Sequence, residues 1–266
     1  MRVLIGGATG AIGRPLIRFL RERGHAVFAL ARSPGSARVV AALGAETVTA
    51  DVLDATAMKA AIMRVRPEAV INELTSLPRH YTVAEMAAAA ERDRQVRIEG
   101  NKNFLAVLPE TGVRRYLLQS SGFWYAPGVG LADENEPFAF AASPAVAAGT
   151  RRYAELEQTA SASTGIEFVA LRYGFFYGPG TWFDSAGDMG EQVRRQEVPV
   201  IGDGQGVCGA GCISRMRRPR PPRHWNARRV PTTLLTTTPP RNSAGYRCSL
   251  TRLAHHRHRV SQKRRR

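Results

Sequence analysis

Two patterns of apolar and polar positions alternate along the first 206 residues. Short apolar runs with the length and composition of buried strands occupy residues 2–6, 25–31, 46–50, 68–73, 115–120 and 166–171. Between them lie stretches that read as helices, at residues 12–24, 36–43, 55–65, 83–108 and 143–163. Strands that alternate with helices of this length, and that are rich in Val, Ile and Leu, indicate a parallel sheet with helices on both faces. We therefore predict an α/β fold with a doubly wound parallel sheet.

The first strand-to-helix turn has the glycine spacing of a dinucleotide-binding fingerprint. It reads GGATGAIG over residues 6–13 and contains Gly7, Gly10 and Gly13. These glycines permit a tight turn, approach of the backbone to a pyrophosphate, and close packing of helix on strand. The following helix N-terminus offers free N–H groups to phosphates. The pattern predicts an NAD(P)-binding Rossmann domain over residues 1–206, and a purely structural turn without cofactor is the alternative.

The residues after the second and third strands bear on cofactor choice. The second strand ends in Leu-Ala-Arg-Ser with no acid to accept the ribose 2′-hydroxyl, whereas Arg32 can pair with a 2′-phosphate. NADP is therefore favoured over NAD, although an arginine at this place can also be ordinary surface. Asp51 and Val52 follow the third strand and are placed to contact adenine. Asp51 can alternatively cap the next helix.

Five motifs occur in an order and spacing that resemble a known family. They are GGATGAIG (6–13), ADVLD (50–54), GNKN (100–103), LLQSSGFWY (117–125) and LRYGFFYGPG (171–180). In this combination the chain resembles the NAD-dependent epimerase/dehydratase family, the extended and atypical short-chain dehydrogenase/reductases. The resemblance covers residues 1 to about 206.

The resemblance implies a cofactor site and a candidate substrate-binding serine. Residues expected to line the cofactor are Gly7, Gly10, Ala11, Ile12, Gly13, Arg32, Asp51 and Val52. Leu74 and Thr75 would lie near the nicotinamide ribose, Asn101 would support the cofactor-facing loop, and Ser121 would bind the substrate oxygen. The implied partner is a small molecule, a sugar nucleotide or another carbonyl or hydroxyl compound. A homodimer is one candidate assembly.

The family's Tyr-x-x-x-Lys acid/base pair is absent. The chain has only three lysines, and none lies four residues after a tyrosine. Alignment of the helix places the family tyrosine at Gly149 and the lysine at Tyr153, and Glu157 is expected to raise the pKa of Tyr153. Tyr125 can replace the acid or can be a packing residue. The chain is thus either an oxidoreductase or epimerase-like enzyme, or a dinucleotide-binding protein without turnover.

The charge of +16 comes entirely from the end of the chain. Residues 207–266 hold 16 of the 38 Lys+Arg and none of the 22 Asp+Glu, so residues 1–206 are formally neutral. We therefore expect no specific nucleic-acid partner. No apolar run approaches the roughly 18 residues that span a bilayer, and no signal architecture is recognised, so we expect a cytoplasmic protein without a membrane partner.

Residues 207–266 replace the substrate-covering lobe that the resemblance implies, so we expect this lobe to be missing or disordered. We hypothesise a frameshift near codons 205–211. In the alternative frame the His224–Trp225 step must encode Leu and the Trp225–Asn226 step must encode Glu, inside a continuous helix. A disordered basic arm is the alternative. A zinc site at Cys208 and Cys212 has poor spacing, and no metal is predicted. The terminal Lys-Arg-Arg-Arg run can bind phosphate charge without sequence selectivity.

Overall fold

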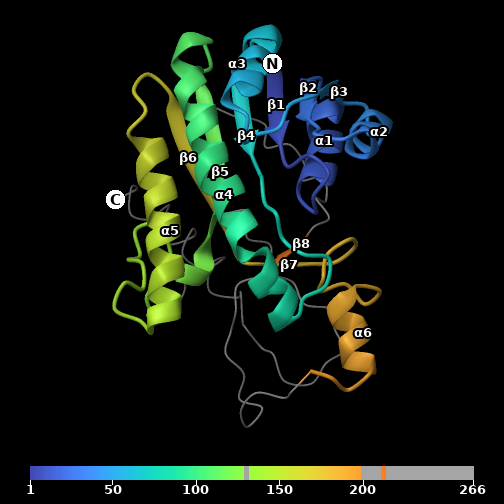
Figure 1. Ribbon diagram of the computed structural model, residues 1–266, viewed down its shortest axis with the longest axis vertical. Coiled ribbons are helices and arrows are strands. Elements are labelled where there is room, and N and C mark those ends of the chain that lie inside the picture. Colours follow the sequence, from blue (N-terminus) through green and yellow to red (C-terminus); the bar gives the residue numbers. More distant parts are fainter. Residues whose placement is uncertain (129–131, 199–210, 214–266) are drawn as a thin grey trace, which may run out of the picture.

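The computed structural model describes residues 1–128, 132–198 and 211–213. A six-stranded sheet with the order β3-β2-β1-β4-β5-β6 forms the centre of the molecule, and every neighbouring pair is parallel (Figure 1). Its strands are β1 (Arg2–Gly6), β2 (Ala26–Leu30), β3 (Glu46–Val48), β4 (Ala69–Asn72), β5 (Arg115–Ser121) and β6 (Glu167–Tyr173). The order reverses between β1 and β4, which is where such sheets bind ligands. The predicted doubly wound α/β fold is confirmed.

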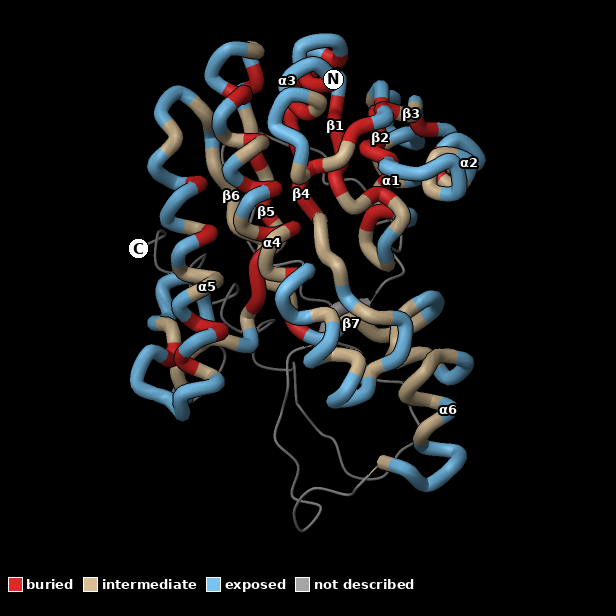
Figure 2. The backbone as a smooth tube through the Cα atoms, viewed as in Figure 1, coloured by how far each residue is buried: buried red, intermediate tan, exposed pale blue. Residues whose placement is uncertain are grey.

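Helices cover both faces of the sheet and form two apolar clusters. One face carries α1 (Gly13–Glu22) and α2 (Pro34–Ala42), which bury Ile17 and Val40 against β1 and β2. The other carries α3 (Ala55–Val65), α4 (Val83–Val107) and α5 (Pro144–Ser161). Figure 2 shows buried backbone concentrated in the central strands. This two-sided burial explains why β1, β2 and β4 consist almost wholly of apolar residues.

Side-chain caps fix where several helices begin. Ser33, Asp54 and Thr82 each accept a hydrogen bond from a backbone N–H in the first turn of α2, α3 and α4 respectively. The alternative in which Asp51 caps α3 is wrong, because Asp54 occupies the cap and accepts from Ala57 N at 2.9 Å. Asp51 Oδ1 instead accepts from Leu53 N at 3.0 Å, which tightens the turn before the helix.

A small lobe follows the main sheet and was not predicted. It contains β7 (Phe175–Tyr177) and α6 (Asp188–Arg194), and β7 pairs in parallel with β8 (Gly211–Ile213), which lies beyond the predicted boundary at residue 206. The Asp188 carboxylate accepts from Tyr81 N at 2.7 Å and contacts the His80 ring at 3.0 Å. The lobe is thereby attached to the loop between β4 and α4, at the carboxyl ends of the strands (Figure 1). Two short 3-10 helices complete the elements, Leu108–Glu110 and Gly122–Trp124.

Most of the tail lies outside the described residues. The frameshift hypothesis, the cysteine pair and the terminal basic run all concern this part of the chain. Among the helices that the structure describes, none combines the length and apolarity that a membrane crossing requires. Among all the residues that the structure describes, no cluster of three or more His, Cys, Asp or Glu side chains is placed to hold a metal ion.

Candidate cofactor-binding site

Glycine is required at two positions of the turn between β1 and α1. Gly7 has φ +77°, and a Cβ there would lie 2.2 Å from the carbonyl oxygen of Glu73. A Cβ on Gly13 would lie 2.4 Å from the carbonyl oxygen of Gly7. At Gly10 the nearest atom to a Cβ would be the same Gly7 oxygen, at 3.2 Å. Gly7 and Gly13 therefore serve the fold itself, whereas Gly10 leaves space beside the turn for a ligand.

A cavity of about 280 Å³ opens beside this turn, at the carboxyl ends of the strands. Six residues predicted for the cofactor line it: Gly7, Arg32, Asp51, Val52, Leu74 and Thr75. Gly10, Ala11, Ile12 and Gly13 form the adjoining turn and the start of α1 without lining the cavity, and Asn101 lies behind it. Lining residues that the sequence did not single out are Ala8, Thr9, Leu30, Ala31, Ser33, Ser36, Ala50, Ser76 and Val96.

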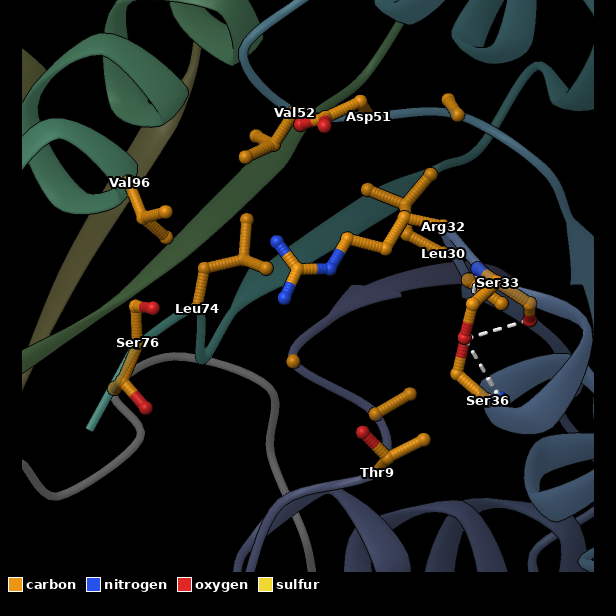
Figure 3. Close-up of a pocket in the computed structure, with 15 residues that line it drawn as sticks. Thr9, Leu30, Arg32, Ser33, Ser36, Asp51, Val52, Leu74, Ser76 and Val96 are labelled. Carbon is orange, nitrogen blue, oxygen red and sulfur yellow. Dashed lines mark hydrogen bonds between the residues drawn. The ribbon is translucent and has the colours of Figure 1, made fainter. Parts of the chain in front are cut away.

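Arg32 places a positive charge inside this cavity. Its side chain leaves the end of β2 and extends across the space toward Leu74 (Figure 3). Within the part of the chain that the structure describes, no hydrogen bond or ion pair engages its guanidinium. Ser33 and Ser36 lie beside it at the N-terminus of α2, where their side chains form a capping box. A free guanidinium in a cavity that is also lined by two serines at a helix N-terminus favours an anionic group.

The GNKN motif supports the cavity wall from behind. Gly100 lets α4 approach Val52, since a Cβ there would lie 2.8 Å from a Val52 methyl. Asn103 Nδ2 donates to the Val52 carbonyl at 2.7 Å. The motif therefore holds the loop after β3, and it does so without entering the cavity.

Asn101 acts on the loop after β4 through two other side chains. Tyr116 OH donates to Asn101 Oδ1 at 2.6 Å, and Asn72 Nδ2 donates to Tyr116 OH at 2.8 Å. Asn72 Oδ1 then accepts from Leu74 N at 3.1 Å. Asn101 is almost completely buried, so its contribution is to position Leu74. Asn72 was missed, because a polar residue ending an apolar strand gives no signal of its partner.

A second polar group surrounds Arg172 on β6, over the ends of β5 and α5. Its guanidinium donates to both carboxylate oxygens of Glu157, at 2.9 and 2.7 Å, and to Tyr125 OH at 3.1 Å. Ser120 Oγ donates to Glu157 Oε1 at 2.5 Å. Ser121, at the end of β5, is buried, and its Oγ accepts from Phe123 N at 3.3 Å. The structure thus brings the candidates Ser121 and Tyr125 to the same end of the sheet.

The place of the family's acid/base pair is filled by an indole ring. A Cβ on Gly149 would lie 2.3 Å from Trp124 Cη2, so the ring covers the position where the alignment puts the tyrosine. Tyr153, at the lysine position, packs behind this ring with centroids 5.8 Å apart. Burial raises the pKa of Tyr153. The expected rise in the pKa of Tyr153 is confirmed, but its assignment to Glu157 is wrong, because that carboxylate is engaged by Arg172 and is not among the causes of the shift.

One buried acid beside the glycine turn was also missed. Glu73 follows β4 directly, its side chain is buried, and Tyr173 OH donates to its Oε1 at 2.8 Å. Burial raises the pKa of Glu73 to about 8, against the hydrogen bond from Tyr173 and the charge of Arg97. The sequence of residues 68–73 predicted a strand that ends in an acid, but it did not indicate that this acid is buried or that Tyr173 binds it.

Comparison with known proteins shows which sequences this chain resembles. A model of the NAD dependent epimerase/dehydratase family matches residues 3–207. The chain is 38% identical over 213 residues to a 3-diazoavenalumate denitrifying reductase of Streptomyces sp, a match covering 78% of this chain and 66% of that protein. It is 27% identical over 211 residues to a 2-alkyl-3-oxoalkanoate reductase of Stenotrophomonas maltophilia, covering 77% and 59%. The chain therefore spans less than two thirds of either reductase.

Solved structures agree on the fold. The UDP-glucose 4-epimerase of Thermus thermophilus, in complex with NAD, superposes with a TM-score of 0.61 at 24% identity, covering 80% of this chain and 71% of that one. At this identity the likeness concerns the fold alone.

Proposed function

The chain belongs to the NAD-dependent epimerase/dehydratase family, and on this premise we propose that it is an NADP(H)-dependent reductase of a small molecule. NAD(H) is the second choice of cofactor. The observation that carries the proposal is the cavity beside the Gly7–Gly13 turn with the unpaired Arg32 guanidinium across it. A 2′-phosphate on the adenosine ribose would pair with Arg32 and accept from the Ser33 hydroxyl.

The cofactor would supply hydride from the nicotinamide, and the protein would bind and orient both reactants. The cavity lined by Leu30, Asp51 and Val52 would hold the adenosine half, and Leu74 and Thr75 would face the nicotinamide ribose. The pyrophosphate would lie against the N–H groups from Ala11 to Gly13, since the Gly10 N–H already donates to Gly7 O at 3.0 Å. Ser121 and Tyr125 would face the substrate at the carboxyl end of β5, whereas Tyr153 would be a packing residue behind Trp124.

Reduction is favoured over epimerisation by the two relatives that are named reductases. The substrates in these two names are a diazo compound and a 2-alkyl-3-oxoalkanoate. A sugar nucleotide is the alternative class. Dinucleotide binding without turnover is the second candidate function, because Gly149 and Trp124 leave no place for the family's tyrosine.

Two measurements test the proposal. NADPH fluorescence should increase on mixing with the protein, and Gly10→Glu should abolish the increase by placing bulk and negative charge at the pyrophosphate. NADPH oxidation is then followed with 3-diazoavenalumate, a 2-alkyl-3-oxoalkanoate and UDP-glucose. Binding with oxidation supports the reductase, binding without oxidation by any of the three supports the second candidate, and no binding refutes both.

We further propose a cytoplasmic location, a dinucleotide-binding domain over residues 1–206 and a frameshifted remainder. Because residues 1–206 are formally neutral, nucleic-acid binding should disappear when residues 207–266 are deleted. Binding that survives the deletion would contradict this assignment.

A further inference from the structure

A reductase that lacks the Tyr-x-x-x-Lys pair needs another source for the proton that follows the hydride. Among the described residues, the polar side chains at the carboxyl ends of β4, β5 and β6 can be compared directly. Tyr125 OH accepts a hydrogen bond from the Arg172 guanidinium, and among the described residues no acid is hydrogen-bonded to it that could replace a lost proton. Ser120 donates to Glu157, whose carboxylate is already paired with Arg172 and is therefore not a proton source. The remaining hydroxyl-and-acid couple at this edge is Tyr173 with Glu73.

This couple lies on the side of the sheet where the strand order has reversed. Glu73 N donates to Gly6 O at 3.0 Å, and the Glu73 carbonyl faces Gly7, so the acid adjoins the glycine turn. Tyr173 is the last residue of β6 and is paired in register with Ser121 of β5. The 2.8 Å hydrogen bond between Tyr173 and Glu73 therefore crosses from β6 to the end of β4, over the end of β5. A dinucleotide whose adenosine half lies over β2 and β3 directs its nicotinamide toward this side.

The surroundings of the Tyr173–Glu73 couple favour the protonated form of the Glu73 carboxyl group. Glu73 is 7% exposed, so its ionised form loses hydration. The groups that act on it are Tyr173 from β6 and Arg97 from α4, and Arg97 is already paired with Asp93 at 2.7 Å and donates to Gln119 at 2.7 Å. Burial outweighs both, and the pKa of Glu73 is raised to about 8. The acid is therefore protonated at neutral pH and can return a proton to the phenol.

We propose that Tyr173 donates the proton in the reduction and that Glu73 restores it. NADPH would supply hydride to the acceptor carbon. The Tyr173 O–H bond would break as its proton forms a bond to the substrate oxygen, and the phenolate would take the proton of the Glu73 carboxyl group. Water then reprotonates Glu73, so that a carbonyl compound, NADPH and one proton become an alcohol and NADP⁺. The proposal rests on the reductase function proposed above.

Two substitutions in the full-length chain test it. Tyr173→Phe removes the donor and should lower kcat about 100-fold, the usual contribution of a general acid, with the Kd for NADPH unchanged. The wild-type kcat should fall as pH rises above about 8, because Glu73 then loses its proton. Glu73→Gln should lower kcat and remove this alkaline limb. Glu167→Gln, at the opposite end of β6, is the matched control and should keep both the rate and the limb.

Unchanged kcat in Tyr173→Phe, or an alkaline limb that persists in Glu73→Gln, would overturn the proposal, because a purely structural pair would leave the limb in place. If the wild-type protein fails to oxidise NADPH with all three candidate substrates, the reductase function is refuted instead. Infrared difference spectra of the wild-type protein still show whether Glu73 is protonated, and so test the Tyr173–Glu73 pair independently. A carboxylic-acid band at neutral pH that is absent from Glu73→Gln supports it, and an ionised Glu73 overturns it.

Discussion

Adding one methyl group at Gly10 or at Gly13 should separate cofactor binding from folding. In Gly10→Ala the new Cβ would meet only the Gly7 carbonyl oxygen, at 3.2 Å, a contact that a shift of a few tenths of an ångström relieves. In Gly13→Ala it would meet the Gly7 oxygen at 2.4 Å and Ala8 Cα at 2.5 Å, both backbone atoms held between β1 and α1. The two variants thus add the same group to the same turn under different constraints.

The expected magnitudes differ accordingly. Overpacking at Gly13 should cost about 2 kcal/mol of the free energy of unfolding, which lowers Tm by roughly 6 °C for a domain of this size. Gly10→Ala should change stability by less than about 0.5 kcal/mol, as for an exposed surface substitution. In the proposed site its methyl group would occupy the approach of the pyrophosphate, so the Kd for NADPH should rise at least about tenfold, or about 1.4 kcal/mol.

Thermal denaturation and NADPH titration of both variants against wild type check these values. The reasoning is refuted if Gly10→Ala binds NADPH as tightly as wild type, because the dinucleotide would then not approach this turn. It is equally refuted if Gly13→Ala matches wild type in Tm, because the distances at Gly13 would then not constrain the packing of α1 on β1.

Three further outcomes are expected. Arg32→Asp should lower the preference for NADPH over NADH by at least about tenfold, as the ratio of the two Kd values shows; an unchanged ratio means that Arg32 does not bind the 2′-phosphate. The wild-type protein should lose stability as pH rises from about 4.5 to about 8, because Glu73 is ionised in the unfolded chain and protonated in the folded one; Glu73→Gln should remove this loss. Above pH 8 the unfolding free energies of the two proteins should differ by on the order of 5 kcal/mol from this effect. Parallel curves of unfolding free energy against pH would contradict the raised pKa. Sequencing codons 200–215 should reveal a frame that continues the fold, whereas an early stop in that frame excludes the frameshift.

Local chemistry made much of the fold predictable. The six apolar runs fall on the six strands, and the predicted helix over residues 55–65 coincides with α3, because periodicity reports burial along a short segment. The lobe with β7 and α6 was missed, since three-residue strands and a two-turn helix carry almost no periodic signal. The cavity was partly predictable: Gly7, Arg32 and Asp51 lie within three residues of the ends of β1, β2 and β3, whose carboxyl ends share one edge.

By itself, the sequence determined the parallel α/β sheet, the glycine turn and the arginine after β2, since each is a property of neighbouring residues. Only the tertiary structure decided that Trp124 fills the space at Gly149 and that Tyr173 reaches Glu73, 100 residues away in the chain. The reason is that such contacts depend on which strands become neighbours and in which register. No residue pattern within a single element encodes either.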